Sequence, residues 1–131
     1  MTGTDMKQAV PISEAESLVM EVLWSDSPRT AEDVVEALRH RQNWQEATIK
    51  TLLNRLLKKG AIQAEKEGRR FLYSPLLTRD QWVVEESSSM LERLFGGRVA
   101  PLVAHFGQHG KLSASDLNAL KALIKELSDD E

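Results

Sequence analysis

The chain has 131 residues, enough for one compact unit with a short second element but too few for two large domains. Hydrophobic residues make up 41% and charged residues 28%, as in an ordinary globular protein. Cysteine is absent, which excludes disulfides, thiolate metal sites and a cysteine nucleophile. No apolar run approaches the ~18 residues of a membrane span, and the N-terminus lacks the apolar core of a signal peptide, so we expect a cytoplasmic location.

The net charge of −3 is distributed unevenly. Between Arg39 and Arg70 there are nine basic residues and three acidic ones, so this segment carries +6 and the rest of the chain −9. A basic segment on an acidic body is typical of a DNA-binding element, because contacts to phosphate are local. Charge alone leaves a solvated charged face as an equal alternative.

Two capping boxes mark the first two helix starts. Ser13–Glu16 and Thr30–Asp33 each place a hydroxyl three residues before a carboxylate, the spacing that satisfies free backbone N–H groups at a helix N-terminus. We expect the first helix to run to about Trp24, where residues 25–28 (Ser-Asp-Ser-Pro) break it, and the second to end near Arg41.

A third helix is predicted from about Gln45 to Lys59, with Asn43 and Glu46 at its start and Gly60 as its C-cap. Its apolar residues follow the stripe of an amphipathic helix, and the opposite face is polar and basic. The stripe consists of Ile49, Leu52, Leu53, Leu56 and Leu57.

The periodicity then changes to that of two short strands, over residues 61–66 and 70–74, with a Glu-Gly-Arg turn between them and Pro75 at the end. This pattern predicts a β-hairpin. Three helices followed by a hairpin form a winged helix. The expected fold class is therefore mostly α with a small β-hairpin, a winged helix-turn-helix plus a C-terminal helical region.

The last third of the chain is predicted to be helical. Helices begin at Thr78, near Val99 and at Ser113, and they are interrupted by Gly96-Gly97 and by residues 107–110. We therefore divide the chain into a winged-helix DNA-binding domain, residues 1–77, and a helical dimerisation region, residues 78–131.

These last helices are too few, and carry too few apolar residues, to bury their apolar faces against one another alone. We expect them to pack against a second copy, since DNA readers of this kind bind two half-sites as two-fold dimers; folding back onto the winged helix of the same chain is the alternative. The residues predicted at the dimer interface are apolar and recur at helical spacing: Leu91, Leu94, Phe95, Leu102, Phe106, Leu117, Leu120, Ile124 and Leu127.

The polar face of the third helix is the predicted recognition surface, because such a helix reads base edges with its N-terminal residues and contacts phosphates with the rest. Ala47, Lys50 and Thr51 are the predicted base readers, since lysine donates to guanine and methyl groups contact the thymine methyl. The other predicted DNA-binding residues lie on or beside this face or at the wing tip: Thr48, Asn54, Arg55, Lys58 and Arg69.

With these elements in place, the chain resembles the penicillinase-repressor (BlaI/MecI/CopY) family of transcriptional regulators. Four stretches carry the resemblance, and the second and third are the most specific. They are residues 12–24 (Ile-Ser-Glu-Ala-Glu, Val-Met, Leu-Trp), 44–60 (Trp, Thr-Ile-Lys-Thr-Leu-Leu, Arg-Leu, Lys-Gly), 67–75 (Glu-Gly-Arg, Phe, Tyr, Pro) and 112–117 (Leu-Ser, Asp-Leu).

The resemblance implies a homodimeric repressor of inverted-repeat operators in double-stranded DNA, controlling a stress or antibiotic response. In antibiotic-responsive members a membrane sensor protease triggers a cut in the dimerisation region, and the matching bond here joins His105 and Phe106. The chain departs from the family pattern at three places: His105 replaces Asn, Gln45-Glu46 replace a Ser-Pro start of the recognition helix, and Ala47 replaces a basic residue. The cysteine cluster of the copper-sensing branch is absent.

The residues do not favour an enzyme. His105 and His109 have i, i+4 spacing, but two ligands without a nearby cysteine or acid make a weak metal site. We expect no catalytic residue, cofactor, bound metal or small-molecule substrate. The remaining alternative is a winged helix that contacts proteins without binding DNA, which would show no salt-dependent binding to a duplex.

Overall fold

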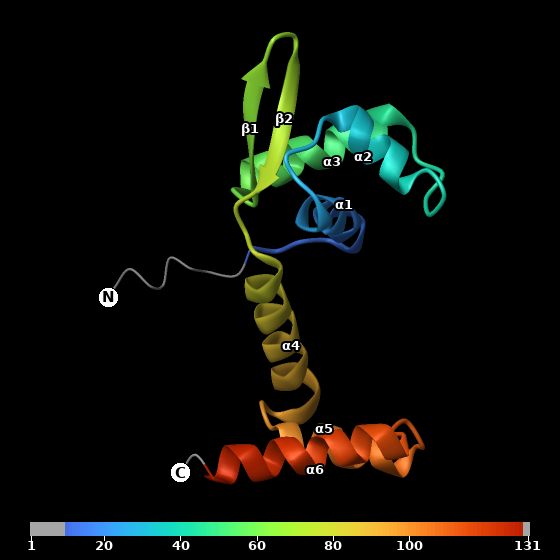
Figure 1. Cartoon of the computed structure of the whole chain (residues 1–131), viewed down its shortest axis with the longest axis vertical. Helices are drawn as coiled ribbons and strands as arrows, with labels where there is room; N and C mark the ends of the chain where they lie inside the picture. Colours follow the sequence, from blue (N-terminus) through green and yellow to red (C-terminus); the bar gives the residue numbers. More distant parts are fainter. Residues whose placement is uncertain (1–9, 130–131) are drawn as a thin grey trace, which may run out of the picture. The chain divides into compact units, whose positions relative to one another are not determined.

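The computed structural model describes residues 10–129, which form six helices and two strands (Figure 1). In chain order they are α1 (Glu14–Ser25), α2 (Ala31–Leu38), α3 (Glu46–Lys59), β1 (Ile62–Glu67), β2 (Arg70–Pro75), α4 (Arg79–Phe95), α5 (Val99–Gln108) and α6 (Ala114–Asp129). In the described part, no helix combines the length and apolar character that crossing a membrane requires.

The chain divides into two units, and the boundary falls between Glu85 and Glu86, inside α4. Our predicted boundary, between residues 77 and 78, precedes that helix. The first turns of α4 remain with the first unit because Trp82 packs against its core and lies 5.4 Å from Trp24, measured between ring centroids.

α1 and α2 begin as the capping boxes predict. At Ser13–Glu16 the two reciprocal hydrogen bonds measure 3.1 and 2.9 Å, and at Thr30–Asp33 both measure 3.1 Å. The predicted end of α2 near Arg41 is wrong, since the helix ends at Leu38. The chain turns there, and the Arg41 N–H donates to the Leu38 carbonyl oxygen at 3.0 Å.

α3 has the predicted extent but a different N-cap. Gln45, with extended backbone, precedes the first helical residue, so the cap is not Asn43. Trp44, the residue before Gln45, packs against the core. At the other end Gly60 is left-handed (φ +77°), as predicted for a C-cap glycine, and the chain turns directly into β1.

The first unit is built around one apolar core. α1, α2 and α3 each bury one face in it, and three further residues close it from the hairpin side: Ala61, Ile62 and Leu77. The buried residues of α3 all belong to the predicted stripe: Ile49, Leu52, Leu53 and Leu56. Burial of this stripe fixes the rotation of α3, so its polar face is turned to solvent.

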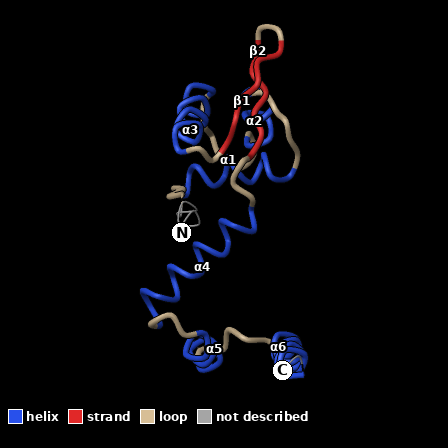
Figure 2. Tube along the Cα trace, turned by 90° about the vertical axis from the view of Figure 1, so that its left-hand side faces the viewer, coloured by secondary structure: helices blue, strands red, loops and turns tan. Residues whose placement is uncertain are grey.

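β1 and β2 form the predicted hairpin, in antiparallel register from Ile62↔Pro75 to Glu67↔Arg70. Its base is fixed to the helices, because Tyr73 on β2 exchanges two backbone hydrogen bonds, of 2.7 and 3.0 Å, with Arg29 in the α1–α2 loop. The tip projects beyond the three helices (Figure 2). Residues 63–70 are exposed, so this wing is free to contact another molecule.

The second unit contains the end of α4 together with α5 and α6. The predicted interruption within residues 107–110 is confirmed: α5 ends at Gln108, and Gly110 is left-handed (φ +66°). Gly107 is tolerated in the helix with Leu112 packed close to it. α6 begins with the predicted capping pair of Ser113 and Asp116, and no residue of α5 or α6 is buried.

Candidate nucleic-acid interface

The exposed face of α3 contains every residue predicted there. Each predicted position on this helix is exposed, and none is needed for the core: Ala47, Thr48, Lys50, Thr51, Asn54, Arg55 and Lys58. The structure therefore brings these side chains to one surface. This surface faces solvent because the apolar stripe on the other side of the helix is buried in the core.

Three of the predicted DNA-binding cations form no ion pair among residues 10–129: Arg55, Lys58 and Arg69. At the wing tip, Arg70 instead lies 3.5 Å from the Glu67 carboxylate. Arg69 is thus the wing arginine that can meet a phosphate without first leaving a carboxylate. Unpaired cations of this kind contribute fully to the counterion release that accompanies DNA binding.

Lys50 differs because it already has a partner. Its Nζ lies 3.2 Å from the carboxylate of Glu46, one helical turn earlier. The two side chains remain 60% and 50% exposed, so the pair stabilises the helix by only about 0.3–0.5 kcal/mol. A good base contact is worth about 1–3 kcal/mol, so this pair does not prevent Lys50 from contacting a base.

Thr51 makes a hydrogen bond within its own helix. Its Oγ1 donates to the carbonyl oxygen of Ala47 at 3.0 Å. The hydroxyl proton is therefore used, and the exposed methyl group remains for an apolar contact such as that with a thymine methyl.

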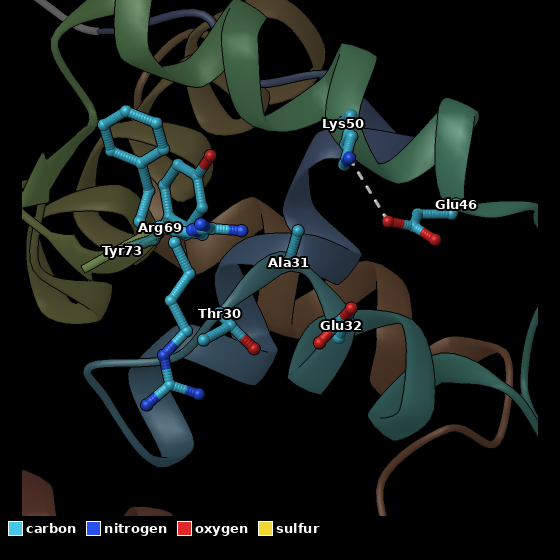
Figure 3. A pocket seen from close by; sticks show the side chains of 9 residues that line it. Thr30, Ala31, Glu32, Glu46, Lys50, Arg69 and Tyr73 are labelled. Carbon is cyan, nitrogen blue, oxygen red and sulfur yellow. Dashed lines mark ion pairs between the residues drawn. The ribbon is translucent and has the colours of Figure 1, made fainter. Parts of the chain in front are cut away.

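A groove of about 210 Å³ lies where the N-terminal ends of α2 and α3 meet the wing (Figure 3). It is lined by Thr30, Ala31 and Glu32 of α2, Glu46 and Lys50 of α3, and Arg69, Arg70, Phe71 and Tyr73 of the wing. Of these, the sequence predicted only Lys50 and Arg69 as DNA-binding. The other residues lie on segments that are distant in the sequence, and no local sequence pattern shows that these segments meet. The capping box at Thr30 does mark the helix end that lines the groove.

Away from this groove, one buried ion pair holds α3 against α1. Glu16 is 2% exposed, and its carboxylate accepts hydrogen bonds from Lys59 Nζ and from the Ser13 N–H. Burial is the largest single influence and opposes ionisation, but Lys59 and Ser13 together outweigh it, so the pKa of Glu16 is lowered from its ordinary value of 4.5. Lys59 is therefore structural, whereas its neighbour Lys58 is exposed.

The residues predicted at a dimer interface are all at least partly accessible. Leu94, Ile124 and Leu127 are the most exposed, at 63%, 60% and 59%. Phe106 and Leu117 are also exposed. The remaining members are half-buried: Leu91, Phe95, Leu102 and Leu120.

The predicted cleavage bond, His105–Phe106, lies inside α5. The His105 ring lies 4.4 Å from that of His109 and 6.1 Å from that of Phe95, measured between centroids. No group of three or more metal-ligating side chains occurs among residues 10–129.

Three helices followed by a two-stranded wing, with a polar and basic outer face on the third helix, define a winged-helix protein of the DNA-binding type. The sequence profile of the penicillinase repressors matches residues 12–126, and the chain belongs to that family.

Individual relatives agree with this assignment. The penicillinase repressor of Bacillus licheniformis is 36% identical over 121 residues, covering 92% of this chain and 94% of that protein. The methicillin resistance regulatory protein MecI of Staphylococcus aureus (strain N315) is 28% identical over 115 residues, covering 88% and 94%. The solution structure of the DNA-binding domain of the repressor BlaI matches with a TM-score of 0.52 and 39% identity, covering 56% of this chain and 90% of that domain. The resemblance and the fold class predicted from the sequence are confirmed.

Proposed function

We propose that this chain is a sequence-specific transcriptional repressor that binds inverted-repeat operators in double-stranded DNA as a homodimer. The observation that carries the proposal is the outer face of α3, where Arg55 and Lys58 lie exposed beside the predicted base readers and have no carboxylate partner among residues 10–129. The groove that contains Lys50 extends this surface to Arg69 on the wing. Membership of a repressor family supports the same function.

Within this interface, Ala47, Lys50 and Thr51 read bases from the first turns of α3. Lys50 donates to guanine, while the methyl groups of Ala47 and Thr51 contact thymine methyl groups. The other contacts position the protein on the sugar–phosphate backbone, with Arg69 acting from the wing. They are made by Thr48, Asn54, Arg55, Lys58 and Arg69.

The second unit provides the dimer interface. Its exposed leucine and isoleucine side chains, such as Leu94, Ile124 and Leu127, give it apolar surface that a partner can cover. A second copy of the chain is the occupant that fits, because a two-fold dimer presents two recognition helices to two half-sites in opposite orientation. An inverted-repeat operator follows from this symmetry.

The relatives' role in antibiotic resistance suggests how repression ends. We propose that a membrane sensor protease triggers a cut between His105 and Phe106, which separates α6 and the end of α5 from the rest of the dimerisation region. Because this bond lies inside α5, the helix must open locally before a protease binds it. Operator binding requires no catalytic group, so we assign no enzymatic activity, and we place the protein in the cytoplasm, where its DNA lies.

A gel-shift experiment with the full chain tests the DNA-binding part of the proposal. The probe is the duplex upstream of the protein's own gene, and a scrambled duplex of equal length is the control, each at two salt concentrations. A discrete complex on the upstream duplex that weakens at the higher salt supports a repressor that controls its own synthesis. Equal binding to both duplexes contradicts autoregulation, and no binding to either duplex favours a winged helix that contacts proteins.

A further inference from the structure

Glu46 is an unusual residue for a surface that meets DNA. It is the first residue of α3, it is exposed, and it lines the groove between the recognition helix and the wing. A carboxylate here repels the phosphates, so its presence lowers the affinity for every duplex. For binding to DNA, such a residue on a recognition helix is favourable only where it meets a donor on a base edge, and the cytosine amino group is such a donor.

The ion pair between Glu46 and Lys50 indicates a role for the Glu46 carboxylate. The carboxylate and Lys50 Nζ lie 3.2 Å apart and form a donor and an acceptor side by side (Figure 3). No other ion pair or side-chain hydrogen bond of Glu46 or Lys50 occurs in the described part of the chain. The two groups therefore keep free hydrogen-bonding capacity, and both belong to the N-terminal turns with which a recognition helix reads bases.

The spacing of this pair matches the major-groove edge of one base pair. In a G·C pair the guanine O6 acceptor and the cytosine N4 donor are joined by a hydrogen bond, so they lie about 3 Å apart. A lysine ammonium and a carboxylate at a similar separation can face them together, ammonium to O6 and carboxylate to the amino group. The ion pair does not have to break to do so.

We propose that Glu46 and Lys50 read one base pair as a unit and that Glu46 is a specificity-determining residue. This inference rests on the proposed function. The pair selects a keto base opposite Lys50 and an amino base opposite Glu46. G·C satisfies both, and its N7 offers Lys50 a second acceptor; T·A satisfies both without that extra acceptor beside the keto group. The reversed pairs, C·G and A·T, set donor against donor and acceptor against acceptor.

Glu32 provides a matched control. It lines the same groove and has the same charge, but it belongs to α2, whereas Glu46 lies on the recognition helix. Glu32→Ala and Glu46→Ala should both raise the affinity for all duplexes, since each removes a negative charge near the phosphates. Only Glu46→Ala should change which base pair is preferred.

The experiment is selection of duplexes from a randomised pool with the full chain, followed by binding titrations on single-base variants of the enriched sequence. Wild type should enrich an inverted repeat in which one position of each half-site is restricted to a keto base, G or T, on the strand that faces Lys50. Glu46→Ala should reduce the discrimination at that position about tenfold, and Glu32→Ala should leave it unchanged. The double variant Glu46→Lys with Lys50→Glu should enrich the same repeat with the orientation of that base pair reversed.

The outcomes separate this inference from the proposed function. A wild-type chain that enriches no repeat contradicts the proposed function and the base-pair reading with it. If wild type enriches a repeat and Glu46→Ala enriches the same repeat with unchanged discrimination at every position, Glu46 does not read a base pair. The proposed repressor function then still stands. This single variant decides the question even where the double variant fails to fold, because Glu46 makes no contact that the core requires.

Discussion

Replacing Lys59 with methionine should destabilise the winged helix far more than the same change at Lys58. Lys59 is the cation that pairs with Glu16, whose side chain is 2% exposed, whereas Lys58 is exposed and has no such partner in the described chain. Removing one member of a buried pair costs about 3–5 kcal/mol, because it leaves an uncompensated charge. Lys59 remains 29% exposed and water can reach the vacated position, so we expect about 3 kcal/mol.

Urea unfolding followed by circular dichroism at neutral pH measures this loss, at one fixed protein concentration because dimerisation contributes to stability. Lys58→Met should change the free energy of unfolding by less than about 0.5 kcal/mol. The double variant Glu16→Gln with Lys59→Met should recover most of the loss, since no buried charge remains. Equal losses for Lys58→Met and Lys59→Met would refute the assignment of Lys59 as structural.

The same pair predicts opposite pH responses in wild type and variant. The pKa of Glu16 is lowered in the folded chain, so its contribution is fully present above the ordinary value of 4.5 and is lost as the pH falls through the folded value. In Lys59→Met, burial of Glu16 without its cation should raise that pKa above 4.5, and acid then relieves the penalty. The difference in stability between the two proteins should therefore narrow as the pH falls from the folded pKa of the variant, above 4.5, to the folded pKa of wild type, below 4.5.

Three further substitutions test the packing, the turn after α3 and the dimer. Leu53→Ala opens a cavity at a side chain with no exposure and should cost about 3 kcal/mol in urea unfolding. In Gly60→Ala the added Cβ would meet no atom within 4 Å, so the free energy of unfolding in the same assay should fall only by the cost of a left-handed alanine, about 1–2 kcal/mol. Leu127→Asp should dissociate the dimer in sedimentation experiments, whereas Asn118→Asp, an exposed position on the same helix, should leave it intact.

Much of the fold could be predicted because its signals are local. The capping boxes at Ser13 and Thr30, the apolar stripe of α3 and the glycine that ends it each depend on residues a few positions apart. The errors lie at the ends of elements. α2 ends at Leu38 and not near Arg41, and α3 is capped at Gln45, next to the core-packed Trp44, and not at Asn43.

The candidate interface could be predicted in part for the same reason. The period of α3 alone determines which of its side chains face solvent, and Arg55 and Lys58 follow from it. The groove brings α2, α3 and the wing together through the tertiary fold, so Glu32 and Phe71 could not be assigned to it in advance. The sequence showed Glu46 as a residue at the start of the third helix and as a departure from the family pattern, and its pairing with Lys50 in the structure supports a role in base reading.

The central claim is that the outer face of α3 binds the DNA backbone, and the salt dependence of operator affinity tests it most directly. The measurement is the slope of log K against log salt concentration between about 50 and 200 mM, for wild type and Arg55→Ala on one inverted-repeat duplex. Each lost phosphate contact reduces the slope by about 0.9, so a dimer that loses two should show a reduction of about 2 with unchanged sequence preference. Identical slopes for the two proteins would contradict the account.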